Sequence, residues 1–162
     1  MFAEVSLSFY LPEHSTALST FELPKKQLQF TALPLTALQA CEEDESRHPV
    51  VIMYQGKPAG FFVLHHGPCI SPFTENPNAL FIRALSVHPA YQGKRVAKRA
   101  MLALPGFASV HFPFCNELVL AVNEKNFAAQ QLYFKAGFQD KGQRRAGTIG
   151  IQYILQLPLA SP

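Results

Sequence analysis

The segment from Ala79 to Leu104 is the part of the sequence that most constrains how this chain can fold. Residues 79–87, ALFIRALSV, are typical of a buried strand, and a His88-Pro89 break ends it. A helix is predicted from about Gln92 to Leu104, with Pro105-Gly106 as its end, because apolar residues recur there at helical spacing. A strand, a glycine-containing turn and a helix N-terminus together present backbone N–H groups that can bind phosphate. We therefore predict a polyanion site at the start of this helix.

Charge supports a local anion site more than a nucleic-acid surface. Four cationic side chains lie around the predicted turn: Lys94, Arg95, Lys98 and Arg99. The net charge of the whole chain is only +3, and it has no basic tail, which argues against nucleic acid as the partner. The acidic run Glu42–Glu45 has two interpretations, a surface that attracts a polycation or a solvated helix end.

The remaining sequence predicts a mixture of strands and helices. Strands are expected at residues 4–10, 49–54, 59–65, 79–87, 117–122, 138–144 and 149–157. Short helical pieces are expected between Glu13 and Asp44, and a later helix, capped by Asn123 or Asn126, should run to Ala136. Strands that precede helices can pair in parallel through crossovers, while hairpins stay antiparallel. The expected fold class is a mixed α/β (α+β) domain.

Length and composition limit the class of protein. With 162 residues, 48% of them apolar and 15% charged, the chain is expected to form a single globular domain over residues 1–162. No apolar run has the length of a membrane span, and the first five residues lack the pattern of a signal peptide. Cys41, Cys69 and Cys115 form no CxxC pair and no zinc pattern, so we expect no metal and a cytoplasmic location.

Two motifs carry a resemblance to a known family. Leu85-Ser86-Val87-His88-Pro89, followed by Gln92-Gly93-Lys94-Arg95-Val96-Ala97, resembles the acyl-CoA pyrophosphate motif of the GNAT N-acetyltransferases, written Gln/Arg-x-x-Gly-x-Gly/Ala. Downstream, Asn126-x-x-Ala129-x-x-Leu132-Tyr133 and Ala136-Gly137-Phe138 resemble the second signature of the family. The resemblance covers about residues 49–157. Arg95 departs from it, because the family commonly has glycine there; we expect Arg95 to adopt helical φ/ψ and to keep its backbone N–H available.

The resemblance implies a fold and a co-substrate. The fold would be a twisted, mostly antiparallel sheet with a central, splayed parallel strand pair, flanked by helices. The co-substrate would be acetyl-CoA, with no metal. The residues that would bind it are Leu85, Ser86, Val87, Gln92, Gly93, Lys94, Arg95, Val96, Ala97, Lys98 and Asn126. In similar proteins the strand before the motif also supplies backbone N–H groups to the acetyl carbonyl, which corresponds here to Leu85 and Val87.

Tyr133 is the catalytic candidate. A phenol is protonated at pH 7, so it can donate to the departing thiolate, and the resemblance to the second signature gives Tyr133 that role. The alternative is a tyrosine that belongs only to the core. Asn126 would bind coenzyme A, cap a helix, or do both. The general base is left open, with candidates at Glu75, His65, His66 and His88.

The predicted activity is acetyl transfer from acetyl-CoA to a primary amine, by direct attack in a ternary complex. The acceptor is expected to be a small molecule or a polyamine, and the N-terminal third and the final hairpin would shape its site. The alternatives are a catalytically silent acyl-CoA-binding regulatory module and an acetyltransferase of protein or peptide amines. A homodimer is possible by analogy with the family, and no nucleic-acid or membrane partner is expected.

Overall fold

The structure is a computed structural model that describes residues 4–159. Residues 1–3 and 160–162, the ends of the domain predicted over 1–162, lie outside the described residues. The strands are β1 (Val5–Phe9), β2 (Arg47–Tyr54), β3 (Lys57–His65), β4 (Ala79–Val87), β5 (Glu117–Asn123), β6 (Gln139–Gly147) and β7 (Gly150–Pro158). The α-helices are α1 (Ser15–Ser19), α2 (Lys25–Leu28), α3 (Pro34–Glu42), α4 (Val96–His111) and α5 (Phe127–Lys135). Single 3-10 turns occupy Pro12–His14, Pro68–Ile70 and Pro89–Tyr91.

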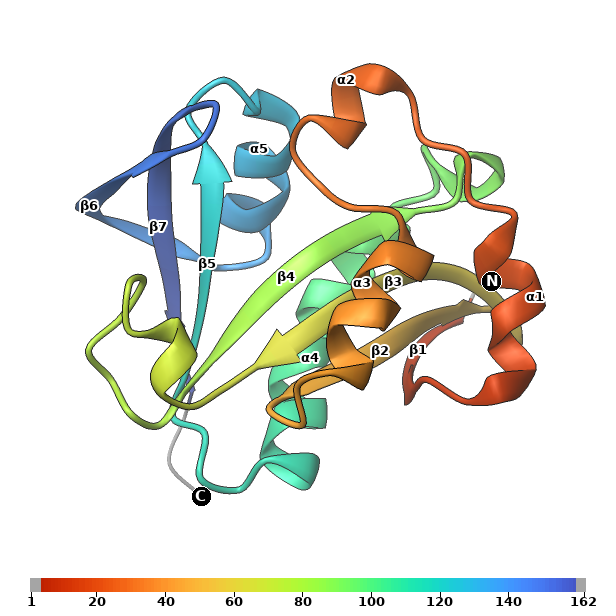
Figure 1. Cartoon of the computed structure of the whole chain (residues 1–162), viewed down its shortest axis with the longest axis horizontal. Coiled ribbons are helices and arrows are strands. Elements are labelled where there is room, and N and C mark those ends of the chain that lie inside the picture. The colour runs from red at the N-terminus through yellow and green to blue at the C-terminus, as the bar shows by residue number, and fades with distance from the viewer. Residues whose placement is uncertain (1–3, 160–162) are drawn as a thin grey trace.

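All the strands belong to one seven-stranded sheet in the order β1-β2-β3-β4-β5-β7-β6 (Figure 1). β4 and β5 are parallel neighbours, and every other neighbouring pair is antiparallel. The crossover between the parallel strands is α4, as expected for strands that cannot be joined by a tight turn. This arrangement confirms the predicted mixed α/β fold with a central parallel pair.

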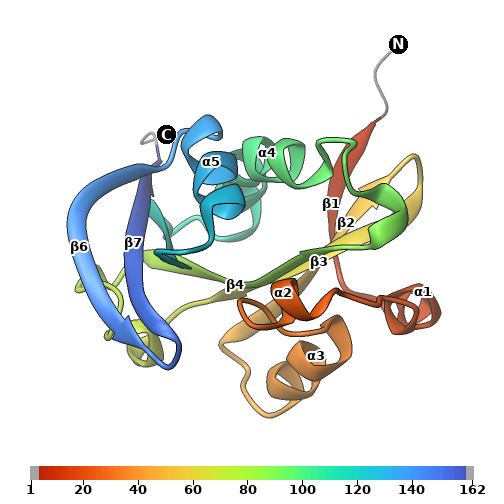
Figure 2. The same cartoon turned by 90° about the horizontal axis from the view of Figure 1, so that it is seen from above.

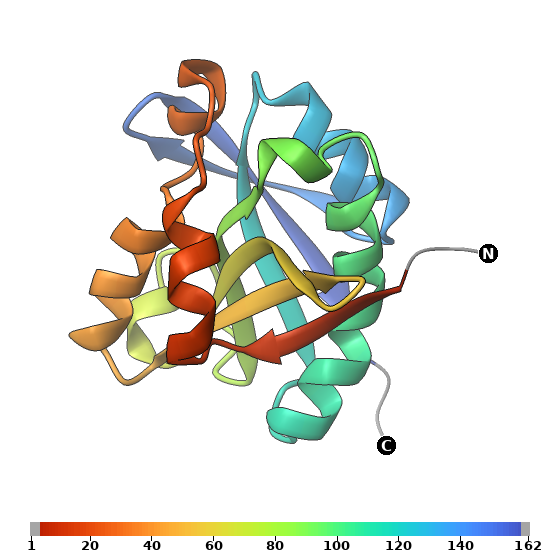
Figure 3. The same ribbon diagram turned by 90° about the vertical axis from the view of Figure 1, so that its right-hand side faces the viewer.

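Helices cover both faces of the sheet. Figure 2 shows α4 and α5 on one face and α1, α2 and α3 on the other, and Figure 3 shows the same layers from the side. The α4 and α5 face holds the larger core, in which Met101, Leu104 and Tyr133 pack on Leu80 and Leu118. A smaller core lies under α1 and α3, and a third joins the loop before β4 to β5 and β7. The core therefore fixes the central strands from both sides.

The two central strands diverge where the polyanion motif begins. Their parallel pairing runs from Ala79 opposite Glu117 to Ile82 opposite Leu120 and then stops. Just beyond, a bulge on β4 places two residues, Ala84 and Leu85, opposite a single residue of β3. Ala84 has a φ of 56°, which marks the bulge. Bulge and divergence together open a V-shaped gap between β4 and β5.

Helix α4 differs from its prediction at both ends. It begins at Val96, four residues after the predicted start, because Gln92 is extended and Gly93 has a φ of 82°. It continues through Pro105 to His111 and does not end at Pro105-Gly106. The buried stripe of the helix runs past the proline to Ala108, so packing on the sheet outweighs the roughly 3 kcal/mol cost of an interior proline. Within residues 4–159, no helix is long and apolar enough to span a membrane.

Candidate active site

A cavity of about 700 Å³ occupies the gap between β4 and β5. On one side it is bounded by the end of β4, the turn before α4 and one face of α5. On the other side it is bounded by the segment around α2 and by the β6–β7 hairpin. This volume lies within the range of small-molecule sites. The segment around α2 and the β6–β7 hairpin belong to the regions that were predicted to shape the acceptor site.

The turn before α4 offers a row of unpaired backbone donors. Within the described residues, no backbone carbonyl accepts a hydrogen bond from the N–H groups of Gly93 to Lys98, and the first such bond of this turn joins Arg99 N–H to the Arg95 carbonyl. Gln92, Gly93, Lys94 and Arg95 are exposed, while Val96 is buried and anchors the helix. Free N–H groups at a helix N-terminus are suited to a diphosphate, so the predicted residues fit the pyrophosphate of coenzyme A.

Arg95 has a conformation that differs from the predicted one. Its φ of 61° and ψ of 26° lie in the left-handed region, so the expectation of helical φ/ψ was wrong. A non-glycine residue in that region costs about 1 kcal/mol, which is a physical reason for glycine at this position in the family motif. The turn needs two left-handed residues close together, Gly93 and Arg95, so that its N–H groups can point outward.

Side chains from the turn before α4 and from the α2 segment close over the end of β4. Gln92 donates from Nε2 to the Val87 carbonyl (2.9 Å) and to Gln27 Oε1 (3.2 Å). Thr31 Oγ1 donates to the Leu85 carbonyl (3.0 Å). The two bonds to β4 carbonyls leave Leu85, Ser86 and Val87 on the wall of the cavity. Ser86 is buried, and its hydroxyl has no hydrogen-bond partner among the described residues.

Helix α5 brings the second motif to the same cavity. Asn126 is the N-cap, and its Oδ1 accepts the Ala129 N–H at 3.3 Å, so of the two predicted caps it is Asn126 that begins the helix. Asn123 is instead buried at the end of β5, where its Nδ2 donates to the Ile149 carbonyl (3.3 Å) and holds the β6–β7 turn. Tyr133 lines the cavity and packs its ring against Phe138, with the ring centres 5.7 Å apart. Tyr133 thus belongs both to the core and to the cavity wall.

Burial raises the pKa of the Tyr133 phenol above its ordinary value near 10. The side chain is 8% exposed, and no charge contributes to the change. The phenol is therefore fully protonated at neutral pH, but it is a weaker acid than a free tyrosine. It suits a hydrogen-bond donor to a developing thiolate better than a strong proton donor.

The four candidate bases lie away from the cavity wall. Glu75 is exposed beside a separate shallow pocket, and His88 Nδ1 accepts the Ala90 N–H at the turn after β4. His66 faces His48, with their Nε2 atoms 3.0 Å apart, and His65 is buried on β3. No aspartate, glutamate or histidine lines the cavity in the part of the chain that the structure describes.

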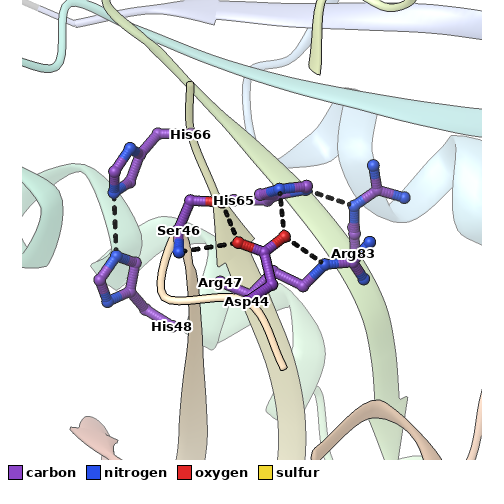
Figure 4. A network of polar contacts seen from close by, with 7 residues as sticks. All are labelled: Asp44, Ser46, Arg47, His48, His65, His66 and Arg83. Carbon is purple, nitrogen blue, oxygen red and sulfur yellow. Dashed lines mark hydrogen bonds and ion pairs between the residues drawn. The ribbon is translucent and has the colours of Figure 1, made fainter. Parts of the chain in front are cut away.

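A partly buried polar network behind the cavity, centred on the buried His65, was missed by the sequence reasoning (Figure 4). Arg83 Nε donates to His65 Nδ1 at 3.0 Å, and His65 Nε2 lies 3.3 Å from Asp44 Oδ2, outside hydrogen-bonding geometry. Ser46 and Arg47 also contact the Asp44 carboxylate and hold the pKa of Asp44 at about 2. A signal was present in the sequence, because Arg83 is the one charged residue of the strand ALFIRALSV.

This network has the residue types of a metal site but the wrong protonation. Ligand atoms of Asp44, His65 and Cys69 lie within 4.8 Å of one another. An arginine Nε can only donate, so His65 Nδ1 is the acceptor and the proton of the neutral ring resides on Nε2. A protonated Nε2 has no lone pair for a metal ion, and a metal-bound histidine normally donates from its other nitrogen. The arrangement therefore serves to hold Arg83.

Sequence comparison identifies the family. The profile described as the Acetyltransferase (GNAT) family matches residues 15–138, most of the chain. The chain belongs to the GNAT acetyltransferase family. The uncharacterized N-acetyltransferase YbbJ of Bacillus subtilis (strain 168) is 45% identical over 156 residues, which are 96% of this chain and 98% of that protein. The spermine/spermidine N(1)-acetyltransferase of the same organism is 22% identical over 86% of this chain and 90% of its own length.

Solved structures agree with the fold of this GNAT protein. The crystal structure of aminoglycoside acetyltransferase AAC(6')-Ib in complex with coenzyme A and kanamycin superposes with a TM-score of 0.76 at 19% identity, covering 96% of this chain and 95% of that one. The predicted family, fold, enzyme class and co-substrate are confirmed: the chain is a GNAT-type N-acetyltransferase that uses acetyl-CoA. The predicted roles of individual site residues stay predictions.

Proposed function

We propose that this protein transfers the acetyl group of acetyl-CoA to a primary amine of a small molecule, by direct attack in a ternary complex. The observation that carries the proposal is one cavity lined by the diverging end of β4, by Tyr133 of α5, and by Gln92 and Ala97 at the start of α4. Beside this cavity, the backbone N–H groups from Gly93 to Lys98 donate to no backbone carbonyl of the described residues. A small acceptor is supported by the cavity volume of about 700 Å³ and by the names of relatives that act on aminoglycosides and polyamines.

The cradle from Gln92 to Lys98 would hold the diphosphate of coenzyme A. Gly93 has no atom within 4 Å of where a Cβ would lie, so a phosphate can approach its backbone. Asn126 and the exposed edge of β4 at Leu85 and Val87 would bind the pantetheine arm and polarise the acetyl carbonyl. In this arrangement the thioester lies in the gap between β4 and β5, beside Tyr133.

The chemistry balances with one net proton transfer. The amine nitrogen attacks the carbonyl carbon, the carbon–sulfur bond breaks, and the amide product and the coenzyme A thiol form. The nitrogen loses a proton to water, because no carboxylate or imidazole among the described residues lines the cavity. Tyr133 donates a hydrogen bond to the departing sulfur, which finally takes up a proton through the phenol and water.

Two measurements test the proposal together. Coenzyme A should raise the melting temperature by mass action, and amines added with acetyl-CoA should release free thiol. A raised melting temperature without thiol release from any amine, amino acid, aminoglycoside or peptide would indicate the silent acyl-CoA-binding module instead. Thiol release with peptides alone would favour the protein or peptide acetyltransferase.

A further inference from the structure

Two arginines from different strands meet at one aromatic ring on the acceptor side of the cavity. The Cζ of Arg83, on β4, lies 5.4 Å from the ring centre of Phe73 and 4.8 Å from that of Phe81. The Cζ of Arg145, on β6, lies 4.6 Å from the ring centre of Phe73. Both arginines and both rings line the cavity. Aromatic faces hold a guanidinium in place and leave its N–H edges available to a ligand.

Neither arginine has a carboxylate partner among residues 4–159. The hydrogen bond of Arg83 goes from Nε to the neutral ring of His65, and its two Nη groups point away from that ring (Figure 4). Arg145 donates from Nη1 to the amide oxygen of Gln152 at 3.2 Å. The neighbouring Arg144 is different, because it makes two bonds to Asp140, at 2.8 and 2.9 Å. Arg83 and Arg145 therefore carry charge that the protein leaves uncompensated by a direct ion pair.

Keeping the guanidinium of Arg83 protonated costs free energy, because the side chain is partly buried beside other cations. Burial, then the charges of Arg47 and Arg145, lower the pKa of Arg83 to about 10, and Cys69 and then Asp44 offset only part of this. Asp44 is itself occupied by Ser46 and Arg47. A partly buried guanidinium beside a second one is stabilised when an anion binds between or beside them. The guanidinium of Arg83 is therefore held in place to bind an anion other than the Asp44 carboxylate.

The remaining charges on the cavity wall have the same sign. Lys26 also lines the cavity, and in the described part of the chain no acidic residue does. The acidic run Glu42–Glu45 lies at the end of α3, outside the cavity wall. A polyamine or an aminoglycoside carries several positive charges, which such a wall would repel and would not pair. The positive charge of the cavity wall is therefore unsuited to a polycationic acceptor.

We propose that the acceptor is an amine that also carries a carboxylate or a phosphate, and that Arg83 and Arg145 bind this anionic group. The inference rests on the proposed function, since it names the substrate class of the same site. Phe73 and Phe81 would contact the carbon skeleton between the two groups. His65 acts as a positioning residue: its Nδ1 directs Arg83 toward the cavity while the ring stays neutral.

The test compares acceptors that differ only in the anionic group. Each of the twenty amino acids is paired with its amide, phosphoethanolamine is paired with ethanolamine, and spermidine represents the polycations. The amino-acid pairs test a carboxylate source and the ethanolamine pair a phosphate source. We expect at least one acid to have a kcat/KM for thiol release at least ~10-fold above that of its partner without the anionic group. Spermidine should be a poorer acceptor than that acid.

Single substitutions test whether each of the two arginines contributes to binding of the anionic group. Arg83→Gln and Arg145→Gln should each lower kcat/KM for the preferred acid by about 10-fold or more, with little change for its partner without the anionic group. Arg144→Gln is the matched control, since Arg144 is adjacent in sequence, exposed and already paired with Asp140; it should behave as wild type. Arg145→Gln keeps the test valid if Arg83→Gln fails to fold.

A binding measurement distinguishes this proposal from the proposed function. With coenzyme A present, 10 mM of the preferred acid should raise the melting temperature of wild type and Arg144→Gln but not of Arg145→Gln. If amides or spermidine react as well as the acids, the anion proposal is overturned while acetyl transfer stands. If no acceptor releases thiol, acetyl transfer fails, and an Arg145-dependent shift with the same set of acids would still support the anion site. The absence of any such shift would refute the anion site.

Discussion

Lowering the pH from 7 to 5 should destabilise the folded protein through His65. The imidazole is fully buried, and burial, followed by the charges of Arg83 and Arg47, lowers its pKa from 6.5 to about 4. A histidine with a lowered pKa binds fewer protons in the folded state than in the unfolded chain. Its contribution to stability is therefore fully present above pH 6.5 and is lost progressively as the pH falls from 6.5 to 4.

The magnitude follows from the two pKa values. At pH 5 the folded imidazole is mostly neutral, whereas in the unfolded chain it lies well below its pKa and is protonated. Since one pKa unit corresponds to about 1.4 kcal/mol, the free energy of unfolding should fall by about 2 kcal/mol between pH 7 and pH 5 because of this one residue. Asp44 does not add to the change, because with a pKa of about 2 it stays ionised over this range.

The assay is urea unfolding at pH 7 and pH 5 for wild type and for His65→Asn. Asparagine can offer Arg83 an acceptor oxygen and does not titrate, so the variant should lose about 2 kcal/mol less than wild type between the two pH values. The pKa of His48 is also lowered by burial, but His48 is present in both proteins and its effect cancels in the difference. Equal losses in the two proteins would refute a neutral His65 beneath Arg83.

Three further predictions concern the co-substrate side of the site. Tyr133→Phe should lower kcat by about 100-fold with little change in the KM for acetyl-CoA, measured by thiol release; an unchanged kcat would remove Tyr133 from catalysis. Gly93→Asp places a carboxylate and a strained backbone in the cradle, so coenzyme A should no longer raise the melting temperature, and retained binding would contradict the phosphate assignment. At Arg95, replacement by Val should destabilise the fold by about 1–2 kcal/mol and replacement by Gly should not, as judged by chemical unfolding; equal effects would show that the left-handed turn carries no strain.

Much of the fold could be predicted from local pattern. The central strand ALFIRALSV, the helix that follows it and the final hairpin all appear close to their predicted places. The boundaries of α4 could not be predicted from local pattern, because they depend on two left-handed residues before Val96 and on packing that continues the helix through Pro105. Left-handed φ at Arg95 has no local signal, since arginine has no preference for that region.

The motifs proposed to bind the co-substrate could be read from the sequence. The turn at Gln92–Lys98 and the Asn126–Tyr133 segment are short-range motifs that can be recognised from neighbouring residues, although the left-handed Arg95 within the turn could not be. The proposed acceptor side could be found only in the folded structure, because Phe73, Arg83 and Arg145 come from three separate segments. These side chains meet because β4 and β5 diverge and the β6–β7 hairpin closes the gap between them. Long-range pairing of that kind leaves no pattern in a local stretch of sequence.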